Sequence, residues 1–475
     1  MKNKSIWENE TTMSSQNNKN NKLPQETDIL IVGGGITGLT TAYLLKDTNK
    51  KITLIDKSKI GHGISSKTTA KISYIQGTIY QTLTNQFSKK HAQQYLNSQL
   101  DAIEIIKKII EENKITCNLE KSDSILFTTE QKGIAKLKKE EELLNGWKIK
   151  TKKISHQQIK YGFKTQNNYI FNPLEYLDAL KNIIASKVDI HENIIATSIQ
   201  KNKNKYIIET SNGKIKTEIV IVASHYPFFI FPTLIPLKTY INREYVNTIP
   251  DVNYQSYNAI NIDKKLHSIR FYKNNLIYTS NQHKLTNKIN YKKNYDQSKK
   301  DTKKYFDRHP QYTWMNQDIM SHDSLPFIGK IEENLYLATA YNAWGMTNGT
   351  IAAKVITDLI QNNKSKYQEL FDPNRKNLAL TINSIIGTLN YLKVYIHALF
   401  QKNNPKYIKI KGLTYGIYKD KNNKEHIINL LCPHMKCNLV FNKEEETWDC
   451  PCHGSRFNID GKLLEGPATK NINKK

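Results

Sequence analysis

The sequence predicts a two-domain protein, in which a large α/β dinucleotide-binding domain precedes a small C-terminal domain that holds a metal centre. Three observations carry this prediction. A buried strand, a glycine turn and a helix follow one another soon after the N-terminus, and two short loops near the C-terminus each carry Cys and His. The chain has 475 residues, which is more than a single hydrophobic core usually supports.

The N-terminal motif predicts the dinucleotide site. Residues 28–32 (DILIV) form an apolar run, and Gly33, Gly35 and Gly38 follow it in the spacing G-x-G-x-x-G. The first glycine permits a tight turn, the second lets the backbone approach a pyrophosphate, and the third allows close helix packing. A second apolar run, 52–55, leads into Asp56, where an acid can hold ribose hydroxyls. This pattern does not separate FAD from NAD.

A late segment makes that choice. Residues 323–329 (DSLPFIG), the apolar run 335–339 and residues 342–349 (NAWGMTNG) together resemble the closing flavin segment of the D-amino-acid-oxidase and glycine-oxidase superfamily. The resemblance extends through residues 61–71, 172–173, 192–193 and 219–227. It implies a Rossmann-like FAD-binding domain of the glutathione-reductase type, with an inserted antiparallel substrate lobe. It also implies a helix whose N-terminus stabilises the negative charge of the reduced flavin.

The same resemblance implies which residues contact FAD. They lie in the glycine turn, around the acid, in the segment after it and at the start of the late helix: Gly33, Gly35, Gly38, Asp56, Lys57, Thr69, Ala70, Ala196, Gly345, Met346 and Thr347. Two departures concern the substrate pocket. Ala340 replaces a glycine expected before Tyr341, and residues 279–281 (TSN) stand where Gly-Gly-Glu is expected.

The C-terminal loops contain Cys432-Pro-His434 and Cys450-Pro-Cys452-His453. This arrangement resembles the Rieske motif, whose [2Fe-2S] cluster takes two thiolates on one iron and two imidazoles on the other. The resemblance implies a small all-β domain in which Cys432 and Cys450 hold one iron, while His434 and His453 hold the other. Mixed Cys and His ligands also suit zinc. The flanking residues 448–449 (WD) and 454–457 (GSRF) favour the Rieske interpretation.

Further features of the loops follow from the Rieske resemblance. Cys437 and Cys452 stand where one Rieske subgroup joins its cluster loops by a disulfide. Ser455 and Phe457 occupy the register of a Ser and a Tyr whose hydroxyls, in high-potential members, donate hydrogen bonds to cluster sulfurs. One hydroxyl is absent here, which implies a middle or lower reduction potential. Residues 435–436 (MK) replace the usual Leu-Gly.

The sequence divides into four regions. Residues 1–24 are rich in Asn, Ser, Lys and Gln, which predicts a disordered tail. The FAD domain is expected over 25–370, a helical linker over 371–404 and the Rieske domain over 405–475. In the linker, apolar residues from Ile382 to Leu399 mark one face of a helix that packs on the FAD domain or contacts a membrane surface or another subunit. In the FAD domain, apolar residues from Leu100 to Ile110 predict a helix covering the core.

The net charge of +27 has to be weighed against the arginine content. Only five of the 70 basic residues are arginine, the residue that bidentate phosphate recognition favours, so the sequence does not favour nucleic-acid binding. An acidic electron-transfer partner is the preferred use of this charge. A secretory leader and a transmembrane segment are not expected, which predicts a cytoplasmic protein. Cys117 is expected to be a buried apolar residue.

The predicted function is flavin-dependent oxidation of a small amine or amino acid, with electrons passing singly through the cluster to or from a redox partner. A redox sensor without turnover and a flavin-dependent RNA-modification enzyme are the alternatives. No catalytic base can be named from the sequence. His225, Arg243 and Arg270 are candidates because they lie near matched segments, and either arginine could clamp a substrate carboxylate.

Overall fold

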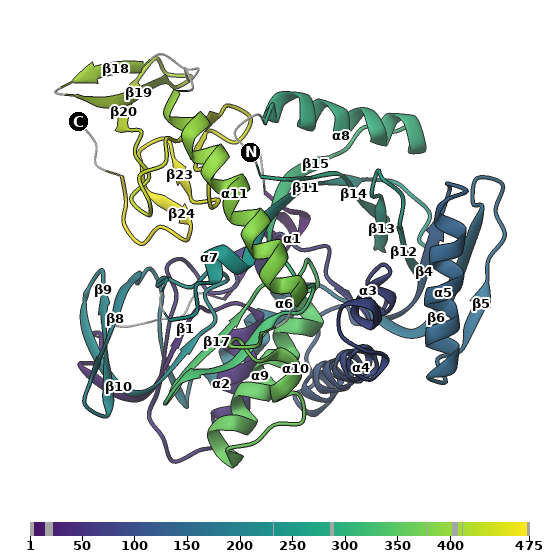
Figure 1. Ribbon diagram of the computed structural model, residues 1–475, viewed down its shortest axis with the longest axis horizontal. Helices are drawn as coiled ribbons and strands as arrows, with labels where there is room; N and C mark the ends of the chain where they lie inside the picture. The colour runs from purple at the N-terminus through teal and green to yellow at the C-terminus, as the bar shows by residue number, and fades with distance from the viewer. Residues whose placement is uncertain are drawn as a thin grey trace.

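The computed structural model describes residues 4–14, 22–230, 232–285, 289–376, 378–400, 407–410 and 412–472. The described residues form four β-sheets. Figure 1 shows that the two large sheets belong to the earlier part of the chain and that the two small sheets form the C-terminal region, coloured yellow-green to yellow.

The first large sheet is the nucleotide-binding sheet. Its central strands pair in parallel in the order β17-β10-β1-β2-β7, while β16 pairs antiparallel with β17 and the hairpin β8-β9 extends β10. Both faces of β1 and β2 are largely buried, as their unbroken apolar runs predict. The strands are β1 Glu26–Val32, β2 Ile52–Ile55, β7 Val188–His191, β8 Ala196–Asn202, β9 Lys205–Thr210, β10 Gly213–Val222, β16 Phe327–Glu332 and β17 Leu335–Thr339.

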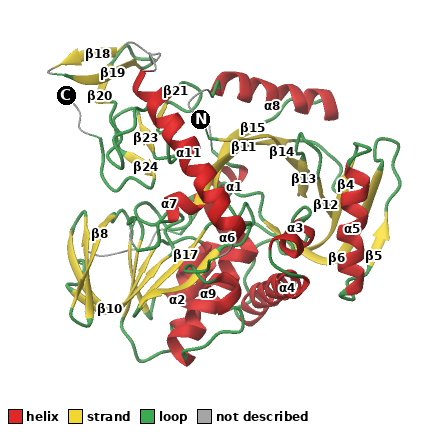
Figure 2. Ribbon diagram, viewed as in Figure 1, coloured by secondary structure: helices red, strands yellow, loops and turns green. Residues whose placement is uncertain are grey.

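The second large sheet, the lobe sheet, confirms the predicted antiparallel lobe. Its strands pair in the order β15-β11-β14-β13-β12-β4-β6-β3, with β5 on β6, and only the β12-β4 pair is parallel among those described. Figure 2 shows these strands as a curved layer. They are β3 Lys71–Ile72, β4 Glu120–Thr128, β5 Thr151–Lys153, β6 Tyr161–Ile170, β11 Thr239–Ile249, β12 Tyr257–Asn261, β13 Ser268–Tyr272, β14 Asn275–Lys284 and β15 Tyr312–Ser321.

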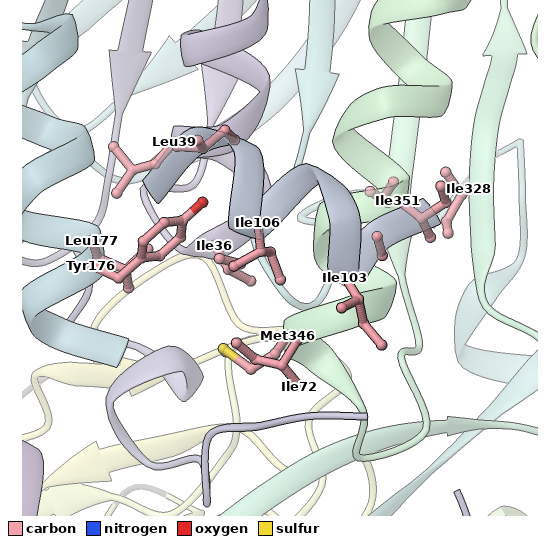
Figure 3. Close-up of a cluster of buried hydrophobic side chains, with 14 of the residues drawn as sticks. Ile36, Leu39, Ile72, Ile103, Ile106, Tyr176, Leu177, Ile328, Met346 and Ile351 are labelled. Atoms are coloured by element: carbon pink, nitrogen blue, oxygen red, sulfur yellow. The ribbon is translucent and has the colours of Figure 1, made fainter. Parts of the chain in front are cut away.

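Helices cover both sheets and enclose the main core. They are α2 Ile36–Leu45, η1 Ile64–Ser66, α3 Ile79–Gln86, α4 Lys89–Glu112, α5 Gly133–Gly146, α6 Pro173–Ile184, α7 Ile235–Lys238, α8 Tyr291–Phe306, α9 Gly345–Asn362 and α10 Gln368–Phe371. Helix α4 is the helix predicted from its apolar spacing. Figure 3 shows its Ile103 and Ile106 in one buried cluster with Ile36 of α2 and Met346 of α9, so the core holds together the helices that follow the two predicted flavin turns.

The N-terminal segment differs from the predicted disordered tail. Residues 6–10 form α1 (Ile6–Glu10), which begins with a capping box between Ser5 and Glu8. Ile6 and Trp7 are fully buried, and the Trp7 indole N–H donates to the Thr68 carbonyl at 2.7 Å. The prediction was therefore wrong for residues 4–14, because a polar composition conceals one apolar anchor. Residues 1–3 and 15–21 lie outside the described part of the chain.

Helix α11 (Leu378–Phe400) occupies the predicted linker position and contacts α7 and β11. Figure 1 shows it extending from the nucleotide-binding region to the C-terminal sheets. Six apolar side chains of α11 are between 47% and 62% exposed, namely Ile382, Ile385, Ile386, Leu389, Leu392 and Ile396. The predicted linker residues 401–404 lie outside the described residues. Among the described helices, none has both the length and the apolar character needed to span a membrane.

The C-terminal region is all-β, as predicted. One antiparallel sheet contains β18 Tyr407–Ile410, β19 Leu413–Lys419 and β20 Glu425–Asn429, and the other contains β21 Val440–Asn442, β22 Thr447–Asp449, β23 Arg456–Asn458 and β24 Leu463–Glu465. Ile428, Leu430, Trp448 and Phe457 form a core of their own with the buried cysteines. This core supports the loops that carry the predicted cluster ligands.

Candidate functional site: a glycine turn and two loops with Cys and His

The glycine turn connects β1 to α2 as the motif predicts. Gly33 has a φ of +114°, and a Cβ added there would lie 2.4 Å from the Ala223 carbonyl oxygen at the end of β10. A Cβ on Gly38 would lie only 1.8 Å from the Gly33 carbonyl oxygen. The N-cap Gly35 offers no side-chain cap to α2. Helix N-termini of this kind present backbone N–H groups and a positive dipole to phosphate, so the turn fits a dinucleotide.

Asp56 lies directly beside this turn. Its Oδ2 accepts a hydrogen bond from the Gly34 N–H at 2.7 Å, and burial raises the pKa of its carboxyl. The Ile194 N–H donates to the Asp56 carbonyl at 2.8 Å, which brings Ala196 at the start of β8 near the same point. Burial lowers the pKa of Lys57, and the Glu465 carboxylate of the C-terminal region opposes this change. The predicted nucleotide residues 56, 57 and 196 are thus close together.

The second predicted flavin segment contains Thr69 and Ala70 and directly precedes β3 of the lobe sheet. The Arg270 guanidinium donates through Nη1 to the carbonyls of Thr69 and Ala70, both at 2.8 Å. Ala70 has a φ of +55° and is fully buried. Trp314 of β15 donates from its indole N–H to the Lys67 carbonyl at 2.9 Å. The lobe sheet therefore fixes the backbone of this segment directly.

Helix α9 begins at Gly345 without a side-chain cap from Trp344. Its first turn is joined to the rest of the FAD region, because Gln76 donates to the Thr347 hydroxyl at 3.3 Å. Ala340, in the loop before α9, has a φ of +60°. This left-handed conformation favours glycine, which accounts for the glycine that the resemblance leads one to expect at this position.

The strands β11 and β15 have two faces with different partners. Their register pairs Glu244 with Asn316 on one face and Arg243 with Gln317 on the other. Trp314 shares the face of Asn316 and contacts the flavin segment, so we call this the inner face. Figure 1 shows α8 and the C-terminal region on the other side of these strands, which we call the outer face.

The two cluster loops are short and closed by backbone hydrogen bonds. In the first, the Cys432 N–H donates to the Cys437 carbonyl at 3.0 Å. In the second, the Cys450 N–H donates to the Ser455 carbonyl at 2.7 Å. These bonds give each loop a fixed base, from which a Cys and a His project.

The predicted ligands come together in this region. The rings of His434 and His453 have centroids 5.0 Å apart, and burial lowers their pKa values to about 4 and about 3. Both are therefore neutral near pH 7, the form in which imidazole binds a metal. The buried Nδ1 of His434 has no hydrogen-bond partner in the described chain. Cys432 and Cys450 are buried and outside the disulfide. This donor set fits a [2Fe-2S] cluster.

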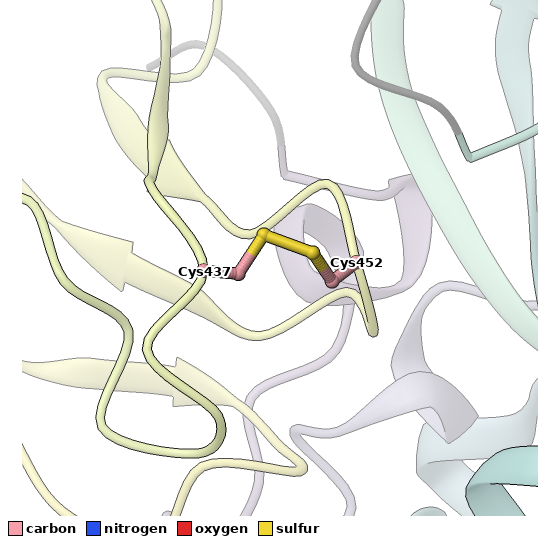
Figure 4. The surroundings of a disulfide bond; sticks show 2 residues. All are labelled: Cys437 and Cys452. Carbon is pink, nitrogen blue, oxygen red and sulfur yellow. A yellow bond between two sulfur atoms is a disulfide. The ribbon is translucent and has the colours of Figure 1, made fainter. Parts of the chain in front are cut away.

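A disulfide joins Cys437 to Cys452, and Figure 4 shows that it connects the two loops. The sulfur atoms of these residues and Cys450 lie within 4.8 Å of one another. Because two of the three sulfurs form the disulfide, this group cannot act as a three-thiolate metal site. Cys117 is buried, as predicted.

The second cluster loop is docked on the outer face of the lobe sheet. Gln317 donates from Nε2 to the Gly454 carbonyl at 2.9 Å, one residue from His453. Arg243 donates to Gln317 Oε1 and to Asp449 Oδ2, each at 2.8 Å, and both charged side chains are fully buried. Asp449 directly precedes Cys450. An ion pair thus anchors the base of the cluster loop.

Other polar contacts extend this junction. Within the C-terminal region, Arg456 forms ion pairs with Glu465 at 2.9 Å, with Asp449 at 3.3 Å and with Glu445, and Gln317 of the lobe sheet donates to Glu465 at 3.0 Å. The Tyr295 hydroxyl of α8 donates to Glu445. The contacts that cross the junction are directional, so a shift of the cluster loop would break the bonds made by Arg243, Gln317 and Tyr295 together.

The structure gives the three candidate substrate residues other surroundings. Arg243 binds a carboxylate, but that carboxylate belongs to Asp449 on the outer face. Arg270 holds the flavin segment and lies against the Trp7 ring, with 4.9 Å from its Cζ to the ring centroid. His225 follows β10, and burial lowers its pKa to about 4. The three residues were candidates because they lie near family-like segments in the sequence. Their position in the sequence did not show which groups they contact in the fold.

Comparisons with known proteins agree with this geometry. Residues 28–359 match the family of FAD dependent oxidoreductases, and residues 391–474 match the Rieske [2Fe-2S] domain. The chain belongs to the FAD-dependent oxidoreductase family. It carries a C-terminal Rieske domain, so its cofactors are FAD and a [2Fe-2S] cluster. This confirms the predicted enzyme class and cofactors, and it decides against NAD and zinc.

A Bacillus subtilis relative combines both parts. This relative is YhfW, described as a Rieske 2Fe-2S iron-sulfur protein. The two chains are 30% identical over 471 residues, which cover 94% of this chain and 92% of YhfW. The Rieske region alone is 37% identical over 67 residues to the cytochrome b6-f complex iron-sulfur subunit of Microcystis aeruginosa, covering 14% of this chain and 34% of that subunit.

Solved structures show the fold of this oxidoreductase region. Glycine oxidase from Geobacillus kaustophilus superposes with a TM-score of 0.64 at 13% identity, covering 74% of this chain and all of that enzyme. L-proline dehydrogenase from P. horikoshii gives a TM-score of 0.62 at 18% identity, covering 74% and 98% of the two chains.

Proposed function

We propose that this oxidoreductase oxidises a small amine or amino acid at FAD and exchanges the electrons singly, through the Rieske cluster, with a redox partner. FAD accepts two electrons as a hydride equivalent, while a [2Fe-2S] cluster passes one at a time. The observation that carries the proposal is the docking of the cluster loop on the outer face of the sheet whose inner face holds the flavin segment. The two centres then exchange electrons without a domain movement.

The proposed residue roles are those that the family resemblance implies. Cys432 and Cys450 hold one iron, and His434 and His453 hold the other. The proposed FAD contacts are Gly33, Gly35, Gly38, Asp56, Lys57, Thr69, Ala70, Ala196, Gly345, Met346 and Thr347. The FAD domain spans 25–370, the helical linker 371–404 and the Rieske domain 405–475. The net charge of +27 supports an acidic partner, and we place the reaction in the cytoplasm as part of this proposal.

The exposed tip of the first cluster loop supports this choice of partner. Met435 is 48% exposed and Lys436 is exposed, and both directly follow the ligand His434. Lys436 has a φ of +57°, so the lysine occupies a left-handed position where the resemblance leads one to expect glycine. An acidic carrier could approach the cluster at this lysine.

The proposal is tested by anaerobic rapid mixing of the holoenzyme with a panel of amines and amino acids. We expect one of them to bleach the flavin and then to reduce the cluster, at a rate that does not depend on protein concentration. Cluster reduction that becomes faster in proportion to protein concentration would show transfer between molecules and would contradict the docked arrangement.

Ser455 and Phe457 give a prediction for the cluster potential. The Ser455 hydroxyl oxygen accepts from the Ala468 N–H at 3.0 Å, which leaves its proton free to donate to sulfur. Phe457 is fully buried and has no hydroxyl. We expect Ser455→Ala to lower the potential and Phe457→Tyr to raise it, because hydrogen bonds to sulfur stabilise the reduced cluster. Redox titration checks both signs, and an unchanged potential in Phe457→Tyr would rule out this mechanism.

A further inference from the structure

The inner face of the lobe sheet carries two carboxylates that form no ion pair within the described residues. Glu244 lies on β11 and Asp318 on β15, and the Asn316 side chain between them donates to Glu244 at 3.2 Å and to Asp318 at 2.7 Å. In the described part of the chain, no lysine, arginine or histidine forms an ion pair with either carboxylate. Both residues have an intermediate exposure, whereas Asn316 between them is only 5% exposed.

Unsatisfied polar atoms lie on the same face. The Oδ1 of Asn316 and the hydroxyl of Thr279 are buried and have no hydrogen-bond partner among the described residues. Thr279 is only 1% exposed. The strand register pairs Thr279 with Ser268 and Val246, which places its side chain on the inner face. Buried polar groups without partners carry an energetic cost, so they indicate a ligand or water that the protein is built to hold.

This set of residues shares its sheet face with Trp314 and Ser268, which contact Lys67 and Lys71 on either side of the flavin segment. Lys71, which follows Thr69 and Ala70 in the chain, donates to Ser268 of the inner face. The Glu244 carboxylate raises the pKa of Lys71, although burial has the larger effect and lowers it to about 7. The carboxylates are therefore on the side of the sheet where the substrate of a flavin enzyme has to lie.

The charges at this position indicate the kind of group that binds there. Burial raises the pKa of the Glu244 carboxyl. Burial, together with the charges of Glu244 and Glu465, raises the pKa of the Asp318 carboxyl. Two neighbouring carboxylates with little access to water repel each other unless a positive group joins them. The Lys71 charge acts on Glu244 but forms no ion pair with it, and the Lys71 amine donates to Ser268 instead. An ammonium group supplies that charge together with three donors, which match Glu244, Asp318 and the free Oδ1 of Asn316.

We propose that Glu244, Asp318 and Asn316 bind the ammonium group of the substrate on the inner face of the lobe sheet. This inference rests on the proposed function, because it assigns the substrate site of the same reaction. The ammonium group can belong to a simple amine or to an amino acid. For an amino acid, the Lys71 ammonium is the nearby cation for the carboxylate, since Arg243 and Arg270 are engaged by other groups.

The test uses oxidised holoenzyme and two probes of similar shape and opposite charge, isobutylammonium and isovalerate. Binding is measured as a saturable change in the flavin spectrum, which requires no turnover. We expect isobutylammonium to bind and isovalerate not to bind. Leucine then distinguishes an amino-acid substrate from a simple amine. If leucine binds more tightly than isobutylammonium, the substrate is an amino acid, and if it binds more weakly, the substrate is a simple amine. Binding of isovalerate without isobutylammonium would overturn the proposal.

Variants test whether each charged side chain strengthens or weakens isobutylammonium binding. Glu244→Gln and Asp318→Asn should each weaken isobutylammonium binding by about tenfold or more, because a charged hydrogen bond is lost. Lys71→Met should strengthen it, since a repelling charge is removed. Glu333→Gln is the matched control, because Glu333 is an exposed residue paired with Lys330. Unchanged affinity in FAD-loaded Glu244→Gln would refute the assignment.

This experiment separates the two proposals. Ammonium binding without cluster reduction would leave the inference intact and contradict the proposed electron transfer. Cluster reduction by a substrate that lacks an ammonium group would contradict the inference and leave the proposed electron transfer intact. If a variant fails to retain FAD, the comparison of isobutylammonium with isovalerate on the unaltered protein still decides the question.

Discussion

Replacing Arg243 by methionine is expected to lower the free energy of unfolding by about 3–5 kcal/mol, because it leaves the Asp449 carboxylate buried without its main cation. Both side chains of this pair are fully buried, and their atoms lie 2.8 Å apart. Burial already raises the pKa of the Asp449 carboxyl, and the arginine counteracts that rise. Thermal unfolding of the holoenzyme measures the change.

Arg243→Met should also slow electron transfer from flavin to cluster. Arg243 also orients Gln317, which holds the Gly454 carbonyl of the cluster loop. Loss of this contact should loosen the docked Rieske domain and slow electron transfer from flavin to cluster, while substrate still bleaches the flavin at its normal rate. Rapid-mixing traces of the two cofactors separate these effects, because only the second phase depends on docking.

Two further variants control this prediction. Lys50→Met removes a basic residue from the exposed Lys50–Glu218 pair, whose side chains are 46% and 39% exposed, and should cost no more than about 1 kcal/mol. Adding Asp449→Asn to Arg243→Met should recover part of the lost stability, since the unpaired charge is gone. Equal losses in Arg243→Met and Lys50→Met would show that the buried pair does not hold the domains together.

The two cofactor regions were predictable because their determinants are local in sequence. At Gly38 any Cβ would collide with the Gly33 carbonyl, so this position of the turn requires glycine. That requirement comes from the turn itself and not from residues distant in the sequence. The paired loops around Cys432 and Cys450 likewise need only a few neighbouring residues to present a Cys and a His each. Motifs of this kind retain their pattern across proteins of low overall identity.

The substrate face and the domain junction were not predictable, because their residues become neighbours only through the curved sheet. Glu244 and Asn316 lie on different strands and are brought together by register. Nothing in the local sequence separates Glu244 from a surface glutamate. Arg243 showed the opposite problem, since its chemistry suggested a substrate clamp while its partner was a carboxylate in a distant domain. One cue was available: β11 is a long strand with polar residues on both faces.

The N-terminal segment and α11 show the limits of composition. Trp7 anchors a polar segment through one indole hydrogen bond and close packing against Tyr272, with ring centroids 4.8 Å apart. A single buried aromatic side chain can offset the ordering of a few residues, which average composition does not reveal. In α11 the apolar spacing correctly predicted a helix, but spacing alone could not show that Ile385 and Leu389 are more than half exposed.

Replacing Gly38 by alanine is expected to remove most of the bound FAD. The added Cβ would lie 1.8 Å from the Gly33 carbonyl oxygen, and a backbone atom in a tight turn cannot move away as a flexible side chain can. Overpacking of this kind costs about 1–3 kcal/mol or more, and 1.4 kcal/mol corresponds to about tenfold in affinity. Relief of the clash would displace α2 from β1 and open the turn that binds the pyrophosphate.

The matched control is Gly146→Ala at the end of α5, where an added Cβ meets nothing within 4 Å. Alanine there should leave the FAD content unchanged and stabilise α5 by up to about 1 kcal/mol, because alanine favours the helix more than glycine does. The ratio of flavin absorbance to protein, measured after gel filtration, compares the two variants. Because the cluster loops lie on a separate core, Gly38→Ala should keep its iron and acid-labile sulfide. Full FAD occupancy in Gly38→Ala would mean that the dinucleotide does not bind at this turn, whereas loss of both cofactors would mean that the variant is unfolded.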